Sequence, residues 1–239
     1  AFDRPPILAM IKPCNGIPVD VIERQFEKLA RAGIDYIKDD ELIADPAHAP
    51  YFERLEACLR ASDKVFKETG HRAIYIPNIT DRQDKIFDKA KKSIEMGAQA
   101  LMLNAHASGY GVLGAIAADK SIHVPLLSHP CYAGSNYMNP MGGLSSSLVF
   151  GKFMRLEGAD IVVYPCAYGK VPALPDRYVR SAQSMLSEFN GMKNTYPSPA
   201  AGLYPGLVPQ VMNDIGEDVM LGAGAAMHAH PDGLAAGVL

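Results

Sequence analysis

Gly33-Ile34-Asp35-Tyr36-Ile37-Lys38-Asp39-Asp40-Glu41 is the stretch around which the chain is organised. Its glycine is suited to end a preceding helix, and the apolar run that follows has the length of a buried strand. The strand ends in a lysine and three consecutive carboxylates. Hard oxygen ligands gathered at a strand end suit Mg²⁺, whereas an isolated run of charge is more often a solvated turn. Other features of the sequence are needed to choose between a metal site and a solvated turn.

Strand-like and helix-like segments alternate along the whole sequence. Apolar runs predict strands at residues 7–12, 33–41, 73–78, 100–104, 124–129, 161–164, 195–199 and 219–221. Helical spacing of apolar residues predicts helices at 18–32, 51–69, 81–96, 112–118, 144–156, 176–189 and 208–215. This alternation predicts parallel βαβ units, and about eight of them in 239 residues match a (β/α)₈ barrel. A doubly wound open sheet is the alternative fold.

Composition excludes several classes of protein. The 239 residues are 48% hydrophobic and 21% charged, as in ordinary globular domains. The net charge of −3 indicates no basic face for nucleic acid, and no apolar run is long enough to span a bilayer. The four cysteines are scattered without a C-x-x-C pair, so neither a zinc site nor a disulfide framework is indicated. A reducing cytoplasm is the expected compartment.

Polar residues follow most of the predicted strands, where a barrel of this kind has its active site. They are Lys12, Lys38, Asp40, Glu41, Asn78, Asn104, His129 and Lys170. Each has a simpler explanation as a turn, structural or solvated residue, but together they favour one shared site at the barrel mouth.

Small residues follow the seventh and eighth predicted strands. Ala201-Gly202 and Gly224-Ala225 would let backbone N–H groups approach a phosphate, although plain tight turns explain them equally well. The turn His230-Pro231-Asp232-Gly233 is expected to begin a small-residue helix whose N-terminus faces the same anion.

These residues resemble the ribulose-bisphosphate carboxylase (Rubisco) large-chain family over nearly the whole chain. The matching segments are Ile11-Lys12-Pro13, Gly33 to Glu41, Gly151-Lys152, Arg155-Leu156-Glu157-Gly158, Gly169-Lys170 and His230-Pro231-Asp232-Gly233. The resemblance implies that CO₂ carbamylates Lys38, and that the carbamate, Asp40 and Glu41 hold Mg²⁺. It also implies that Lys12 contacts the enediolate oxygens, that His129 lies near the substrate, and that Lys170 sits on a mobile loop.

Departures from the carboxylase pattern point to another reaction. Cys14 stands where the carboxylase has a second lysine, Pro130 where it has an arginine, and Val163 where it has a histidine. Ala200-Ala201-Gly202 replaces a Ser-Gly-Gly segment. The chain therefore looks like a Rubisco-like protein, most similar to the 2,3-diketo-5-methylthiopentyl-1-phosphate enolase branch of methionine salvage. Lys170 departs from that branch, where a smaller residue is expected.

The resemblance leaves three functions open. The first is a Mg²⁺-dependent enolase or isomerase that enolises a phosphorylated keto sugar without fixing CO₂. The second is a decarboxylase or transcarboxylase of a 3-oxo sugar-acid phosphate, and the third is a non-catalytic relative. Residues 1–239 are expected to be a barrel catalytic domain that is truncated at both ends, with an N-terminal α+β domain missing. That missing domain implies a homodimer or a higher homo-oligomer, with no nucleic-acid or membrane partner.

Overall fold

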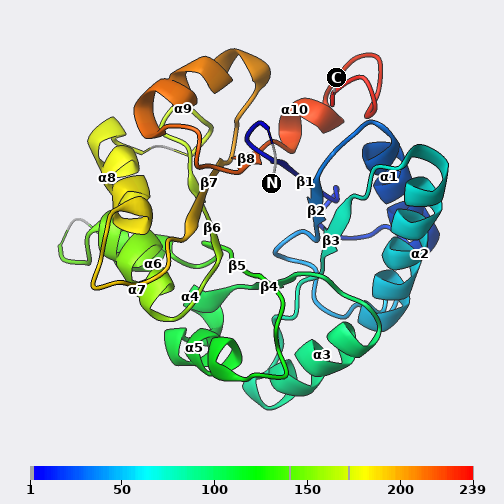
Figure 1. The fold of residues 1–239 in the computed structure, drawn as a ribbon, viewed down its shortest axis with the longest axis horizontal. Helices are drawn as coiled ribbons and strands as arrows, with labels where there is room; N and C mark the ends of the chain where they lie inside the picture. The colour runs from blue at the N-terminus through cyan, green and yellow to red at the C-terminus, as the bar shows by residue number, and fades with distance from the viewer. Residues whose placement is uncertain (1–2, 140, 172, 239) are drawn as a thin grey trace.

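Strands form a ring and helices surround it in the computed structural model, which describes residues 3–139, 141–171 and 173–238 (Figure 1). The strands are β1 Ile7–Met10, β2 Tyr36–Lys38, β3 Ile74–Ile76, β4 Leu101–Leu103, β5 Leu126–Ser128, β6 Ile161–Pro165, β7 Tyr196–Ala200 and β8 Leu221–Gly222. The α-helices are α1 Val19–Arg31, α2 Tyr51–Thr69, α3 Gln83–Glu95, α4 Ala105–Ser108, α5 Tyr110–Ala118, α6 Gly134–Tyr137, α7 Phe153–Leu156, α8 Pro175–Leu186, α9 Val208–Ile215 and α10 Ala225–His228. A π-helix, η1 Ser147–Lys152, precedes α7, and a 3₁₀ turn, η2 Pro205–Leu207, precedes α9.

The strands pair in parallel as two four-stranded sheets. Their orders are β3-β2-β1-β8 and β4-β5-β6-β7. The sheets meet at an isolated parallel bridge between Asn78 and Met102, and the Met220 N–H donates to the Pro197 carbonyl across the other seam, at 3.0 Å. Parallel strands alternating with helices are as predicted, but continuous pairing around a barrel is not seen among the described residues. Pro197 and Pro199 of β7 have no N–H to donate, and β8 has only two residues, so the second seam forms few hydrogen bonds.

The apolar core has two layers. An inner cluster inside the ring draws one or two residues from most strands, such as Leu8, Ile76, Met102 and Val163. A larger outer cluster lies between the strands and the helices. Because successive strand residues point to opposite faces, strands buried on both sides become apolar at nearly every position. The functional residues are left at the strand ends.

Helix boundaries follow the sequence where a clear stop signal exists. The predicted helix at 51–69 is confirmed, and Gly70 ends it at φ 75°. The predicted helix at 144–156 is instead π-helical over Ser147–Lys152 before α7 begins. The predicted helix after His230 is wrong: α10 comes earlier, at Ala225–His228, and residues 231–238 form turns. No helix in the described ranges is both long and apolar enough to cross a membrane.

A substitution at Gly151 tests how closely the π-helix packs on α8. A Cβ built there would lie 2.8 Å from the Ser184 Cβ and 3.2 Å from the Ser181 carbonyl oxygen. Gly151→Ala should therefore destabilise the fold by about 1–3 kcal/mol through overpacking. A Cβ at Gly111 of α5 meets nothing within 4 Å, so the control Gly111→Ala should instead stabilise by roughly 0.5 kcal/mol. Urea unfolding measures both changes, and a shift of the same sign in the two variants would contradict this packing.

Candidate active site

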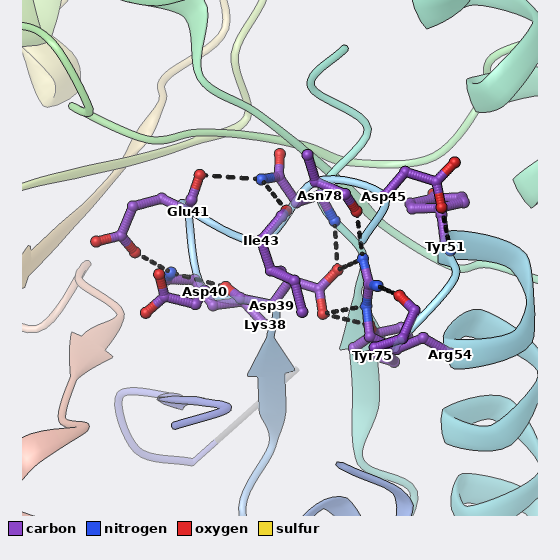
Figure 2. Close-up of polar contacts among 12 residues, drawn as sticks. Lys38, Asp39, Asp40, Glu41, Ile43, Asp45, Tyr51, Arg54, Tyr75 and Asn78 are labelled. Atoms are coloured by element: carbon purple, nitrogen blue, oxygen red, sulfur yellow. Dashed lines mark hydrogen bonds and ion pairs between the residues drawn. The ribbon is translucent and has the colours of Figure 1, made fainter. Parts of the chain in front are cut away.

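The middle carboxylate of the acidic stretch is not available to a ligand. Asp39 and Arg54 are both fully buried, and two hydrogen bonds of 3.1 and 3.2 Å join the guanidinium to the carboxylate (Figure 2). Asp39 also accepts hydrogen bonds from the Tyr75 hydroxyl and from the Asn78 N–H. A buried carboxylate needs such partners, because leaving it unpaired in the interior is strongly unfavourable. Asp39 thus joins β2, α2 and β3 behind the site.

Two strand-end asparagines hold the backbone of the acidic turn. The side-chain amide of Asn78 donates to the carbonyls of Glu41 and Ile43, at 3.2 and 3.1 Å (Figure 2). The amide of Asn104, at the end of β4, donates to the same Glu41 carbonyl at 2.9 Å. These residues, predicted at the strand ends as candidates, position the acidic turn.

Lys38, Glu41 and His129 form a connected polar group. Lys38 is 1% exposed, and its Nζ donates to the Asp39 carbonyl at 2.9 Å and to Glu41 Oε2 at 3.1 Å. Glu41 Oε2 also lies 3.4 Å from His129 Nε2. Burial is the largest single influence and would raise the pKa of Glu41, but the charge and hydrogen bond of Lys38, the nearby His129 and a backbone N–H together outweigh it and hold that pKa at about 2. Glu41 is therefore ionised at neutral pH.

The ring of His129 is neutral, with its proton on Nε2. Its burial, followed by the charge of Lys38, lowers the pKa of His129 to about 3, so the ring is neutral at pH 7. The Cys131 N–H donates to His129 Nδ1 at 3.2 Å. Because Nδ1 is then the acceptor, Nε2 carries the proton and faces Glu41. In this tautomer the polarity of the Nε2–H is favourable toward the Glu41 carboxylate, 3.4 Å away.

Lys12 and Asp40 form the second ion pair of the site. Lys12 follows β1, its Nζ contacts Asp40 Oδ2, and the Gln25 amide holds the Lys12 carbonyl at 2.6 Å. Burial opposes a charged Lys12, but its hydrogen bond and Coulomb attraction to Asp40 raise its pKa above the ordinary value. Lys12 is therefore a stable cation, one-third exposed at its side chain.

One cavity of about 340 Å³ gathers the predicted site residues from both sheets. Its lining includes Lys12, Lys38, Glu41, His129, Lys170, Ala201, Gly202, Gly224 and Ala225. These groups come from the ends of six different strands and line one cavity, whereas Asn78 and Asn104 lie behind it and hold the acidic turn. Asp40 joins them through its contact with Lys12.

The glycines at the predicted phosphate ends pack closely against the protein itself. A Cβ on Gly202 would lie 2.6 Å from the Lys170 backbone nitrogen, and one on Gly224 would meet the Met10 side chain. Ala201 adopts φ 68°, a left-handed conformation that is unfavourable for a residue with a Cβ. Gly202 is thus required by close backbone packing, whether or not an anion also approaches.

His106 is a polar residue near the site that the sequence analysis missed. It is the second residue of α4, two positions after Asn104, and its Nδ1 lies 3.1 Å from the Tyr110 hydroxyl. Burial lowers the pKa of His106 to about 4, so it is neutral. The only sequence signal was its position just beyond a strand end. Within the described residues, no group of three or more His, Cys, Asp or Glu side chains is arranged to hold a metal.

Comparison with known proteins identifies relatives over the full chain. The family described as "Ribulose bisphosphate carboxylase large chain, catalytic domain" matches residues 1–239. A ribulose bisphosphate carboxylase-like protein of Archaeoglobus fulgidus is 41% identical over 235 residues, covering 98% of this chain and 54% of the relative. A 2,3-diketo-5-methylthiopentyl-1-phosphate enolase of Microcystis aeruginosa is 39% identical over 237 residues, covering 99% and 60%.

Solved structures agree with these matches. The Rubisco-like protein MtnW from Alicyclobacillus acidocaldarius superposes with a TM-score of 0.94 at 36% identity, covering 99% of this chain and 59% of the other. The octameric Rubisco of Pyrococcus horikoshii gives 0.93 at 27% identity, covering 99% and 56%. The chain therefore spans somewhat more than half the length of its relatives.

Replacing Arg54 should lower the free energy of unfolding, because Asp39 would then be a buried charge without a cation. Arg54→Met leaves the carboxylate without its cation, and we expect a loss of about 3–5 kcal/mol in the free energy of unfolding. Arg60→Met is the matched control on the same helix, because Arg60 forms an exposed ion pair with Glu23 at 2.9 Å. That change should cost about 0–1 kcal/mol. Urea denaturation compares the two, and similar losses would show that the buried pair has no special role.

Proposed function

The chain belongs to the Rubisco large-chain catalytic-domain family, and from this premise we propose that it bears the site of a Rubisco-like enolase or isomerase. The proposed substrate is a phosphorylated keto sugar or diketone, such as the methylthio-bearing diketone phosphate of methionine salvage. The supporting observation is one cavity lined by Lys12, whose ammonium pairs with Asp40, and by the group formed by Lys38, Glu41 and His129. The strands would form a closed (β/α)₈ barrel around it.

The chain covers only 54–60% of the length of the two relatives compared. The activity of the whole protein is therefore proposed along with that of this domain. We propose that residues 1–239 act as the barrel domain of a longer protein with an N-terminal α+β domain. A homo-oligomer is expected, by analogy with the octameric Rubisco of Pyrococcus horikoshii, one of the structural neighbours.

The donor set fits Mg²⁺ once Lys38 is carbamylated. Asp40 and Glu41 supply carboxylate oxygens, and the buried Lys38 Nζ lies 3.1 Å from Glu41 Oε2. As a cation, Lys38 neutralises these carboxylates; as a carbamate formed with CO₂, it would become a third anionic oxygen ligand. Lys38, Asp40 and Glu41 would then hold Mg²⁺, which stabilises negative charge on a substrate carbonyl oxygen.

The chain's own residues bind and orient the substrate. Lys12 is a fixed cation beside the cavity, so it can donate a hydrogen bond to an oxygen on which negative charge develops. His129 in its Nε2–H form faces the Glu41 carboxylate at 3.4 Å and is neutral, so it adds no charge to the site. Lys170 lines the same cavity and supplies a second cation toward the substrate. Phosphate would bind near Ala201-Gly202 and Gly224-Ala225, on the small-residue side.

The absence of the carboxylase's arginine and histidine supports enolisation without CO₂ fixation. Pro130 and Val163 line the cavity in those places and carry no charge. The full-length protein should exchange the α-proton of a phosphorylated diketone for deuterium in the presence of Mg²⁺. It should incorporate no labelled CO₂ into ribulose bisphosphate. Release of CO₂ from 3-oxo sugar-acid phosphates without proton exchange on diketones would instead establish the decarboxylase, and no reaction on either class would leave a non-catalytic relative.

Lys38→Ala should abolish Mg²⁺-dependent proton exchange while the fold is retained. The substitution removes the proposed carbamate, one of three protein ligands, so the rise in melting temperature on adding Mg²⁺ and bicarbonate should disappear as well. Lys91→Ala, which breaks only a surface ion pair with Asp119, is the control and should behave as wild type. Activity of Lys38→Ala within about tenfold of wild type, a gap of roughly 1.4 kcal/mol, would rule out the ligand role.

Ala225→Asp should weaken binding of the phosphorylated substrate specifically. Ala225 is exposed and lines the cavity, so the new carboxylate would repel an anion beside it. We expect KM for the phosphorylated substrate to rise at least about tenfold, with a smaller effect on a dephosphorylated analogue. Ala235→Asp, exposed in the C-terminal turns, is the matched control. Equal losses for both ligands would place the phosphate elsewhere.

A further inference from the structure

The turn that carries Lys170 is held to the rim of the cavity by its own backbone. It follows β6, and within it the Gly169 N–H donates to the Cys166 carbonyl at 3.1 Å. The Lys170 N–H donates to the carbonyl of Ala201, just after β7, at 2.7 Å. The two segments approach so closely that a Cβ on Gly169 would collide with the Ala201 carbonyl oxygen. The backbone of Lys170 is therefore seated against the end of β7.

Tyr168 ties the same turn to the outer helices. Its hydroxyl donates to Asp214 Oδ2 on α9 at 2.6 Å, and its ring packs edge-on against Tyr178 of α8 with centroids 6.2 Å apart. Helices α8 and α9 lie next to each other outside the ring of strands (Figure 1). The hydrogen bond to Asp214 raises the pKa of Tyr168 above its ordinary value, so the hydroxyl is a protonated donor at neutral pH. The turn is thus held from the outside as well as from the rim.

The acceptor of this hydrogen bond is itself fixed on its helix. The Gln210 amide, one turn earlier on α9, donates to Asp214 Oδ1 at 2.7 Å and also hydrogen-bonds with the Tyr168 hydroxyl. Val211 of α9 and Cys166 at the start of the turn are fully buried in one apolar cluster. Helix α9 and the turn therefore pack as a unit, and a hydrogen bond to a charged acceptor is stronger than one between neutral groups.

We propose that Tyr168 is a positioning residue, whose bond to Asp214 keeps the turn in the arrangement in which Lys170 lines the cavity. Lys170 is two residues from Tyr168 and lines the cavity, whereas Tyr168 and Asp214 do not. If a turn adopts its binding arrangement for only a fraction of the time, the apparent affinity for a ligand falls by that fraction. The inference rests on the proposed function for the role of Lys170, and it adds a contact outside the cavity that sets substrate affinity.

Hydrogen exchange at the Lys170 amide tests the anchor without any substrate. Tyr168→Phe removes only the hydroxyl, so in the full-length protein this amide should exchange about three- to tenfold faster, as expected for the loss of one hydrogen bond. Asp214→Ala should do the same, whereas Asp214→Asn, which keeps an acceptor oxygen, should have a smaller effect. Tyr204→Phe, exposed just before η2, is the control and should change nothing. Unchanged exchange in Tyr168→Phe would overturn the proposal, and so would equal effects of the two Asp214 variants.

Calorimetry tests whether the anchor acts through Lys170. Tyr168→Phe should raise the Kd of the full-length protein for a phosphorylated diketone about three- to tenfold, since the binding arrangement is populated less. In a Lys170→Met background the same substitution should raise Kd by less than about twofold, because the group that it positions is gone. A full further rise in that background would show that Tyr168 does not act through Lys170, and would refute the inference. Amide exchange and Kd values that respond as expected, in a protein that exchanges no substrate proton, would refute the enolase function alone.

Discussion

The buried ion pair between Asp39 and Arg54 is the constraint on which the site depends. Its two hydrogen bonds fix the end of β2 against helix α2, and Arg54 also donates to the Ala49 and Ala44 carbonyls of the following loop, at 2.6 and 3.1 Å. A buried pair of this kind contributes little net stability compared with apolar packing, yet either partner alone is strongly unfavourable. Its effect is therefore geometric: it ties the backbone that carries Lys38, Asp40 and Glu41 to helix α2 and the following loop.

The three neighbouring carboxylates have two different roles, one structural and two at the cavity. Asp39 faces the interior behind the strand, while Asp40 and Glu41 pair with Lys12 and Lys38 at the cavity. Each cavity carboxylate thus has a cation of its own, and the site is electrically balanced while Lys38 remains an ammonium. Conversion of that ammonium to a carbamate anion would shift the local charge by two and create the demand for a divalent cation.

Much of this could be predicted from sequence, because strand ends and helix stops carry strong local signals. The spacing of Val65 and its neighbours together with Gly70 predicted α2, and the strand-end positions predicted which groups share a cavity. Three adjacent acidic residues cannot be told apart in a sequence. Asp39 is buried at a different place from the other two because it pairs with Arg54, a residue fifteen positions away whose proximity is seen only in the folded chain. The π-helix and the position of α10 were also missed, and both lie where distant segments meet closely: Gly151 packs on α8 and Gly224 on the Met10 side chain.

The division into two sheets has a consequence for how the chain reaches its folded state. Strands β4 to β7 come from one continuous stretch of sequence, so their pairings close short loops. The other sheet joins β8 to β1, residues more than two hundred positions apart, as in the Ile7–Leu221 register. Loop closure over that distance has a larger entropic cost, and contacts between distant residues form late. Assembly should accordingly begin in the half that holds β4 to β7, with the acidic turn aligned against Asn104 only when the two halves dock.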